Sequence, residues 1–213
     1  MSGFLFWFII VTNIASGRFG YETFSGLDSE AKLQKINSDP QRFKTAFTLI
    51  FIEHLSIICL AFMLFFAFSS YGLILAVVWV ISRTLEAVIQ IYFKKDYWGL
   101  LSIARKYSGT SGAEKDELID SSRNVLETKN TVFKVAQIFF SIGTIAYSIL
   151  FVISGAVPDI IGWFGIVASG VYGLGNGANL VKPDFKAIWN VGGLLIFIFE
   201  LVLGGWLLFS TLL

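Results

Sequence analysis

The chain has 213 residues, of which 55% are hydrophobic and 15% are charged, and its mean hydropathy is +0.73. Soluble domains have about 45–50% apolar and about 25% charged residues, so this composition excludes an ordinary water-soluble fold. Sixteen basic and 15 acidic residues give a formal net charge of +1, which provides no reason to expect a nucleic-acid partner.

Long apolar segments predict an all-α membrane protein. A helix needs roughly 20 mostly apolar residues to cross the hydrocarbon layer, where its backbone groups must be satisfied internally. Six segments qualify, so we expect a single domain, a bundle of six transmembrane helices in contact with the lipid bilayer. The predicted spans are 3–17, 45–68, 71–93, 132–153, 160–181 and 187–213. The first also resembles a signal-peptide core, but it lacks a preceding basic residue and a small-x-small cleavage pattern, so we expect it to be retained.

Two connections are too short for anything but a tight turn. Ser69-Ser70 joins the second span to the third, and the turn around Pro158 joins the fourth to the fifth. These two pairs are therefore expected to be antiparallel hairpins.

The first and third loops contain amphipathic segments. Leu27, Ala31, Leu33 and Ile36 alternate with charged residues, which predicts a short helix on the membrane surface that ends at Asp39-Pro40. In the third loop, residues 97–107 predict a second interfacial helix. After a Gly- and Ser-rich break, residues 113–129 form a charged helical run that enters the fourth span.

The distribution of Lys and Arg predicts the orientation. Fifteen of the 16 lie in the first, third and fifth loops or at the ends of the adjoining spans, and none lies at the termini or in the tight turns. Because cytoplasmic loops are enriched in basic residues, we expect the chain to be integral to the cell membrane with both termini outside.

Five ionisable residues fall deep inside the predicted spans, where a charge costs about 2.5–3.5 kcal/mol on insertion scales. They are Glu53, His54, Arg83, Glu86 and Glu200. In the 71–93 span, Arg83, Glu86 and Gln90 share one helix face. At about 1.5 Å per residue, the ionisable residues form one layer near the midplane. The candidate ligand- or proton-binding residues are Glu53, His54, Arg83, Glu86, Gln90, Glu200, Asn176 and Asn179.

This layer of ionisable residues has two possible interpretations. Arg83 could bridge Glu86 and Glu200 in a network that only fixes helix packing. Alternatively, three carboxylates against one arginine leave an excess of acid, which favours binding of a proton, a cation or a small polar ligand.

Metal binding and catalysis are less favoured. Glu53 and His54 are adjacent and point about 100° apart on a helix, so both could ligate one metal only with distortion. The sequence has no nucleophile elbow, second histidine or phosphate-binding glycine loop. We therefore expect no metal, no cofactor and no catalytic residue.

Small residues recur every four positions in the 160–181 span, at Gly165, Ser169, Gly173 and Gly177. Such a stripe lets another helix approach closely. We expect intramolecular packing, with Gly192-Gly193 and Gly204-Gly205 as candidate partners, and keep a homodimer contact as the alternative.

Four motifs in order resemble an uncharacterised group of prokaryotic membrane proteins, the domain of unknown function 4386 family. They are SEAKLQKINSDPQRF at 29–43, SRTLEA at 82–87, IGWFG at 161–165 after the Pro158 turn, and FELVLGGWLL at 199–208. The resemblance covers nearly the whole chain. It implies six helices and assigns no activity.

The leading functional hypothesis is a membrane protein that binds or translocates a small polar solute, proton or cation at the midplane layer. The alternative is a non-catalytic accessory or structural subunit of a larger membrane complex, with the basic loops and the glycine stripe as contact surfaces.

Overall fold

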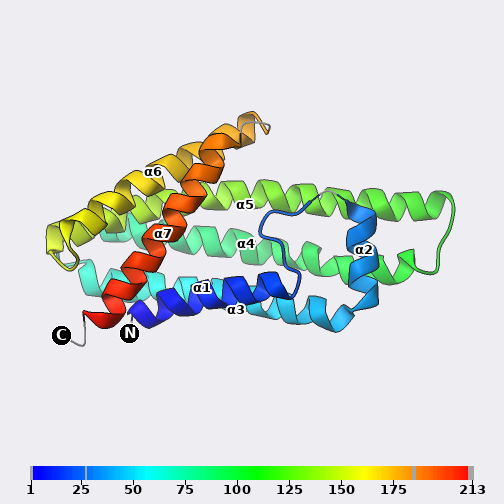
Figure 1. The fold of residues 1–213 in the computed structure, drawn as a ribbon, viewed down its shortest axis with the longest axis horizontal. Coiled ribbons are helices and arrows are strands. Elements are labelled where there is room, and N and C mark those ends of the chain that lie inside the picture. The colour runs from blue at the N-terminus through cyan, green and yellow to red at the C-terminus, as the bar shows by residue number, and fades with distance from the viewer. Residues whose placement is uncertain (1, 27, 184–185, 211–213) are drawn as a thin grey trace.

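The computed structural model describes residues 2–26, 28–183 and 186–210, and in these ranges the protein is entirely α-helical with seven helices and no strand. Six are long and one is short (Figure 1). Their bounds are α1 Ser2–Arg18, α2 Ser29–Ser38, α3 Pro40–Phe68, α4 Leu73–Tyr107, α5 Ala113–Ser154, α6 Asp159–Val181 and α7 Ala187–Phe209. The residues 211–213, at the end of the last predicted span, lie outside the described residues.

Four helices, α3, α4, α5 and α7, are long and apolar enough to cross a membrane, which makes this a membrane protein. The other two long helices differ in character. Helix α1 is apolar but shorter, and α6 has 23 residues but contains six glycines and two asparagines that lower its hydropathy. The long-span criterion thus selects four of the six predicted crossings.

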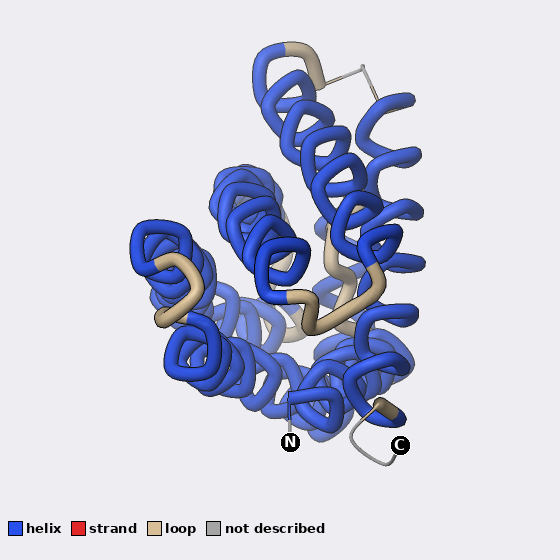
Figure 2. The backbone as a smooth tube through the Cα atoms, turned by 90° about the vertical axis from the view of Figure 1, so that its left-hand side faces the viewer, coloured by secondary structure: helices blue, strands red, loops and turns tan. Residues whose placement is uncertain are grey.

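The six long helices form a closed ring. Each packs against the next in the order α1, α3, α4, α5, α6, α7 and back to α1. Figure 2, which looks along the long axis of the molecule, shows the helices around this ring. Helices α3 and α4, and likewise α5 and α6, are consecutive hairpins as predicted, with turns at residues 69–72 and 155–158. Gly155 supplies the left-handed backbone (φ 65°) that ends α5.

Asp39 and Pro40 separate α2 from α3 as the sequence predicts. The Asp39 carboxylate accepts a hydrogen bond from the Arg42 backbone N–H at 2.9 Å, and Pro40 occupies the first turn, where its missing N–H is not needed. Asp28 caps α2 in the same way, accepting from Ala31 N at 3.0 Å.

The surroundings of α2 differ from expectation. Its apolar face was predicted to contact a membrane surface, but Leu33 and Ile36 are buried against protein, in a cluster with Leu100, Ala104 and Leu126. The reason is that α4 and α5 continue beyond their apolar segments and offer α2 an apolar partner. Leu27, part of the predicted pattern, lies outside the described residues.

The predicted second interfacial helix at 97–107 is not a separate element. It continues α4 without interruption, because Lys94, Lys95 and Asp96 change the polarity of the helix but do not break its hydrogen bonding. The charged run at 113–129 likewise continues into the apolar part of α5, as expected.

Candidate functional site

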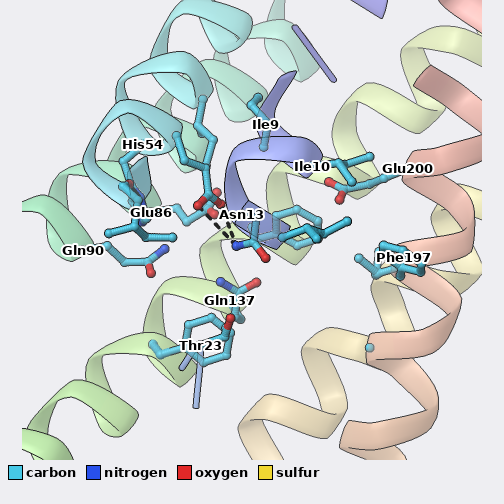
Figure 3. A pocket seen from close by; sticks show the side chains of 18 of the residues that line it. Ile9, Ile10, Asn13, Thr23, His54, Glu86, Gln90, Gln137, Phe197 and Glu200 are labelled. Atoms are coloured by element: carbon cyan, nitrogen blue, oxygen red, sulfur yellow. Dashed lines mark hydrogen bonds between the residues drawn. The ribbon is translucent and has the colours of Figure 1, made fainter. Parts of the chain in front are cut away.

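A cavity of about 200 Å³ lies inside the ring, and all six long helices contribute to its wall (Figure 3). Six of the eight predicted ligand-binding residues line it, together with polar residues from α1, α5, α6 and the first loop. The predicted residues in the wall are Glu53, His54, Arg83, Glu86, Gln90 and Glu200, and the additional polar ones are Asn13, Tyr21, Thr23, Gln137 and Tyr172.

Helix α3 contributes Glu53 and His54. The amide Nδ2 of Asn13 on α1 faces both carboxylate oxygens of Glu53, at 3.1 and 3.2 Å (Figure 3). His54 Nδ1 lies 2.6 Å from the Ile50 carbonyl oxygen, an arrangement in which Nδ1 carries the proton and donates it. The adjacent positions thus differ in role, because Glu53 joins two helices whereas His54 is held by its own helix.

Helix α4 contributes the ion pair of the site. Arg83 Nη1 lies 2.6 Å from Glu86 Oε2, one turn further along the helix, and both side chains are buried. The guanidinium also stacks over the ring of Phe140, 4.5 Å from its centroid. Gly143 on α5 leaves the space for the arginine, since a Cβ there would lie 3.2 Å from Arg83 Cγ.

Glu200 on α7 stands apart from this pair. Figure 3 shows it beside Ile10, on the opposite side of the cavity from Glu86 and Gln90. Among the described residues Arg83 forms an ion pair with Glu86 and none with Glu200, so only the Glu86 side of the bridge in the packing interpretation is present. The physical reason is distance along the wall: the i, i+3 spacing within α4 brings Glu86 to Arg83 directly, whereas Glu200 comes from a helix across the ring.

The cavity therefore combines three carboxyl groups with one guanidinium that is already paired. Such an excess of acid in a desolvated site is balanced by a bound proton or a bound cation. Among the residues that the structure describes, no group of three or more His, Cys, Asp or Glu side chains is arranged to hold a metal ion.

The chain matches a known protein family. The family described as "Domain of unknown function (DUF4386)" matches residues 1–210. The chain belongs to this family. The resemblance carried by the four sequence motifs is thereby confirmed, and no activity comes with the DUF4386 assignment. No curated protein and no solved structure matches the chain.

In this DUF4386 protein, the two predicted asparagines of α6 do not line the cavity. Asn176 Nδ2 donates to the Tyr172 carbonyl at 2.8 Å, and Asn176 Oδ1 accepts from Trp189 Nε1 at 3.1 Å. Asn179 Nδ2 donates to the Pro183 carbonyl at 3.0 Å. Both side chains thus organise the junction of α6 and α7, which the sequence could not distinguish from a cavity-facing position.

The glycine stripe packs mainly against α5 rather than against the glycine pairs of α7. A Cβ at Gly165 would lie 2.4 Å from both Ser148 Oγ and Phe199 Cζ, and one at Gly173 would lie 2.9 Å from Ser141 Cβ. Ser169 is fully buried and donates to the Gly165 carbonyl. Gly177 differs, because no atom lies within 4 Å of a Cβ built there. The intramolecular role therefore applies to the first three positions.

The segment 19–26 between α1 and α2, which we call the strap, closes the basic end of the cavity. Lys129 Nζ donates to the carbonyls of Glu22 and Thr23 at 2.6 and 2.9 Å and to Ser25 Oγ at 3.1 Å. Asn130 adds two hydrogen bonds to the backbone of Ser25, at 2.8 and 2.9 Å.

Two further contacts hold the strap. Lys32 donates to the Gly20 carbonyl and pairs with Glu22; burial lowers the pKa of Lys32 and the Glu22 carboxylate raises it in part. The ring of Phe24 lies 5.4 Å from that of Trp189 at the start of α7. Sequence reasoning missed the strap residues Tyr21 and Thr23 in the cavity wall, because a loop without periodicity gives no signal of where it folds back.

Proposed function

We propose that this protein is a single domain with six membrane crossings and that both termini face outward. The closed ring supports crossings by α1 and α6, because each is inserted between two other long helices. The basic residues of the α2 region and of the long ends of α4 and α5 gather at one end, and the start of α1, the end of α7 and the two tight turns gather at the other (Figure 1). The positive-inside bias gives this arrangement its direction.

Cysteine labelling tests the orientation. In a Cys59→Ala background, Ser70→Cys places a thiol in the α3–α4 turn and Ser108→Cys places one in the α4–α5 connection. A membrane-impermeant maleimide should label intact cells at position 70 and not at position 108. The reverse labelling would invert the proposed orientation, and labelling of both would refute the crossing of α4.

We further propose that the cavity binds a small solute that carries a positive charge, in the class of simple ammonium ions. The main support is that Glu200 lines the cavity and has no ion-pair partner among the described residues. The guanidinium of Arg83, in the same wall, is already paired with Glu86. Glu53 offers a second carboxylate, and its hydrogen-bond partner among the described residues is the neutral amide of Asn13.

The size of the cavity agrees with a small cation. A volume of about 200 Å³ equals the volume of roughly seven water molecules in the liquid. It is below the roughly 300–1,000 Å³ of sites for drug-sized ligands. An ammonium group with a few carbon atoms fits within it.

Thermal unfolding of the purified protein tests this proposal. Ethylammonium chloride should raise the melting temperature in a saturable way at constant total salt, because a ligand of the folded state stabilises it by RT ln(1 + [L]/Kd). The change Glu200→Gln should remove this response. Glu117→Gln, which neutralises an exposed carboxylate near the start of α5 and outside the cavity wall, is the matched control and should retain it. A wild-type protein that responds to sodium and ethylammonium equally weakly would refute the proposal.

A further inference from the structure

The wall of the cavity has a side opening between α1 and α7. The two helices touch near the start of α1, where a Cβ at Gly3 would lie 2.4 Å from Leu208 N and one at Gly204 would lie 3.1 Å from Phe6 Cβ. Farther along they diverge (Figure 1). In the divergent part, Ile14 and Phe197 both line the cavity and are 48% and 43% exposed, so the wall is open there.

The ends of the cavity that the structure describes are closed in a different way. At the basic end, the strap lies across the cavity, held by Lys129, Asn130 and the Phe24–Trp189 contact. At the other end the ring is filled by buried aromatic side chains, among them Trp79 and Phe199. The side opening therefore connects the acidic interior with the outer surface of the helix ring, which lipid covers in a membrane.

The side opening and the interior differ in polarity. Ile10, Ile14 and Phe197 are apolar, whereas Asn13, Glu53 and Glu200 in the same cavity wall are polar or acidic. An apolar chain in the opening would replace lipid at Ile14 and Phe197 without exposing a polar group. Because the interior holds only a small group, a larger ligand must leave its apolar part in the opening.

We propose that the natural ligand is a lipophilic amine, with one ammonium head and one apolar chain, that enters from the bilayer. The head lies between Glu53 and Glu200, and the chain passes between Ile14 and Phe197 into the lipid. A phospholipid is a poorer match, because its phosphate would lie among three carboxyl groups. This inference rests on the proposed binding of ammonium ions and names the ligand class of that same cavity.

The test compares decylamine with ethylamine on the whole protein in nanodiscs of zwitterionic lipid. Ligand concentrations are corrected for partition into empty nanodiscs, and affinities are taken from the melting temperature. Ile14→Trp fills the opening and should weaken decylamine binding at least tenfold, with less than a twofold effect on ethylamine. Val11→Trp, on the exposed face of α1 outside the cavity wall, is the matched control and should change neither affinity. Phe197→Trp fills the opening from α7 and serves if Ile14→Trp fails to fold.

The outcomes separate this inference from the function on which it rests. If both amines bind wild-type protein, depend on Glu200, and are unaffected by Ile14→Trp and Phe197→Trp, the cation site stands and the side opening is refuted as the path of the chain. If neither amine binds wild-type protein, the proposed function fails and this inference fails with it. Selective loss of decylamine in both opening variants supports it.

Discussion

The amide of Asn13 faces both carboxylate oxygens of Glu53, a residue 40 positions later in the chain, and this contact fixes α1 against α3 beside the cavity. Asn13→Ala leaves a buried carboxyl group without its donor, so we expect a loss of about 1–3 kcal/mol in unfolding free energy. Unfolding in mixed detergent micelles measures it.

A double-mutant cycle with Glu53→Gln identifies the cause. If the contact is responsible, the two single losses should not add in the double variant. Asn190→Ala, which removes an exposed asparagine of α7, should change stability by less than about 0.5 kcal/mol. Strict additivity of Asn13→Ala and Glu53→Gln would contradict the contact.

The Arg83–Glu86 pair leads to the second prediction. Removing one partner of a buried pair strands the other charge, so Arg83→Ala should cost about 3–5 kcal/mol, visible as lost expression or a lower melting temperature. The double change Arg83→Leu with Glu86→Leu should recover most of that loss, because no charge is then left alone.

The exposed pair of Arg123 and Asp120, 3.9 Å apart, is the control on α5. Arg123→Ala should cost less than about 1 kcal/mol, since solvent screens that pair. Near-normal stability of Arg83→Ala would mean that Glu86 does not depend on the guanidinium.

The sequence predicts the relative positions of site residues only where their helices are joined by a tight turn. The tight turn between α3 and α4 fixes their relative depth, which predicts Glu53, Arg83 and Glu86 at one level, and all three line the cavity. Asn13 is not among the candidate residues predicted from the sequence, because nothing in the sequence shows that α1 packs beside α3.

The contacts of the α6 asparagines and of the strap could not be predicted from the sequence. Asn176 and a cavity-lining asparagine have the same local sequence signal, and the difference arises from Trp189, which occupies the facing position on α7. Lys129 sits in a run of mixed charges typical of a solvated helix face, yet it is buried, because the strap supplies three acceptors for its ammonium group.

The glycine stripe of α6 provides a matched pair for the third prediction. Gly165→Ala places a methyl group 2.4 Å from Phe199 Cζ, so overpacking should cost about 1–3 kcal/mol. Gly177→Ala meets no atom within 4 Å and should be neutral or stabilise by about 0.5–1 kcal/mol, since alanine favours the helix. Thermal unfolding of the two variants measures the difference.

Substitution of Gly177 also tests whether the glycine stripe contacts a second copy of the chain. We propose that any contact with a second copy through this stripe includes Gly177, the member left open within the chain. Gly177→Leu should then lower the oligomeric mass measured by native mass spectrometry. An unchanged mass, together with a stabilising Gly177→Ala, would restrict the stripe to packing within one chain.

The last prediction concerns the strap. Lys129→Met removes three hydrogen bonds from the strap while keeping the length of the side chain. Hydrogen bonds from charged groups contribute about 1.5–3 kcal/mol each, so local opening of residues 19–26 should become at least about tenfold more frequent. Hydrogen exchange read out by mass spectrometry should therefore show faster exchange in a peptide that covers residues 19–26, with little change in α5 itself.

Lys106→Met is the control, because Lys106 is exposed at the end of α4 and its loss should leave strap exchange unchanged. Unchanged exchange in Lys129→Met would show that Asn130 and the Phe24–Trp189 contact hold the strap without the lysine. Because Tyr21 and Thr23 belong to both the strap and the cavity wall, faster opening in Lys129→Met should also weaken ethylammonium binding. That coupling would link the basic end of the molecule to the acidic site inside it.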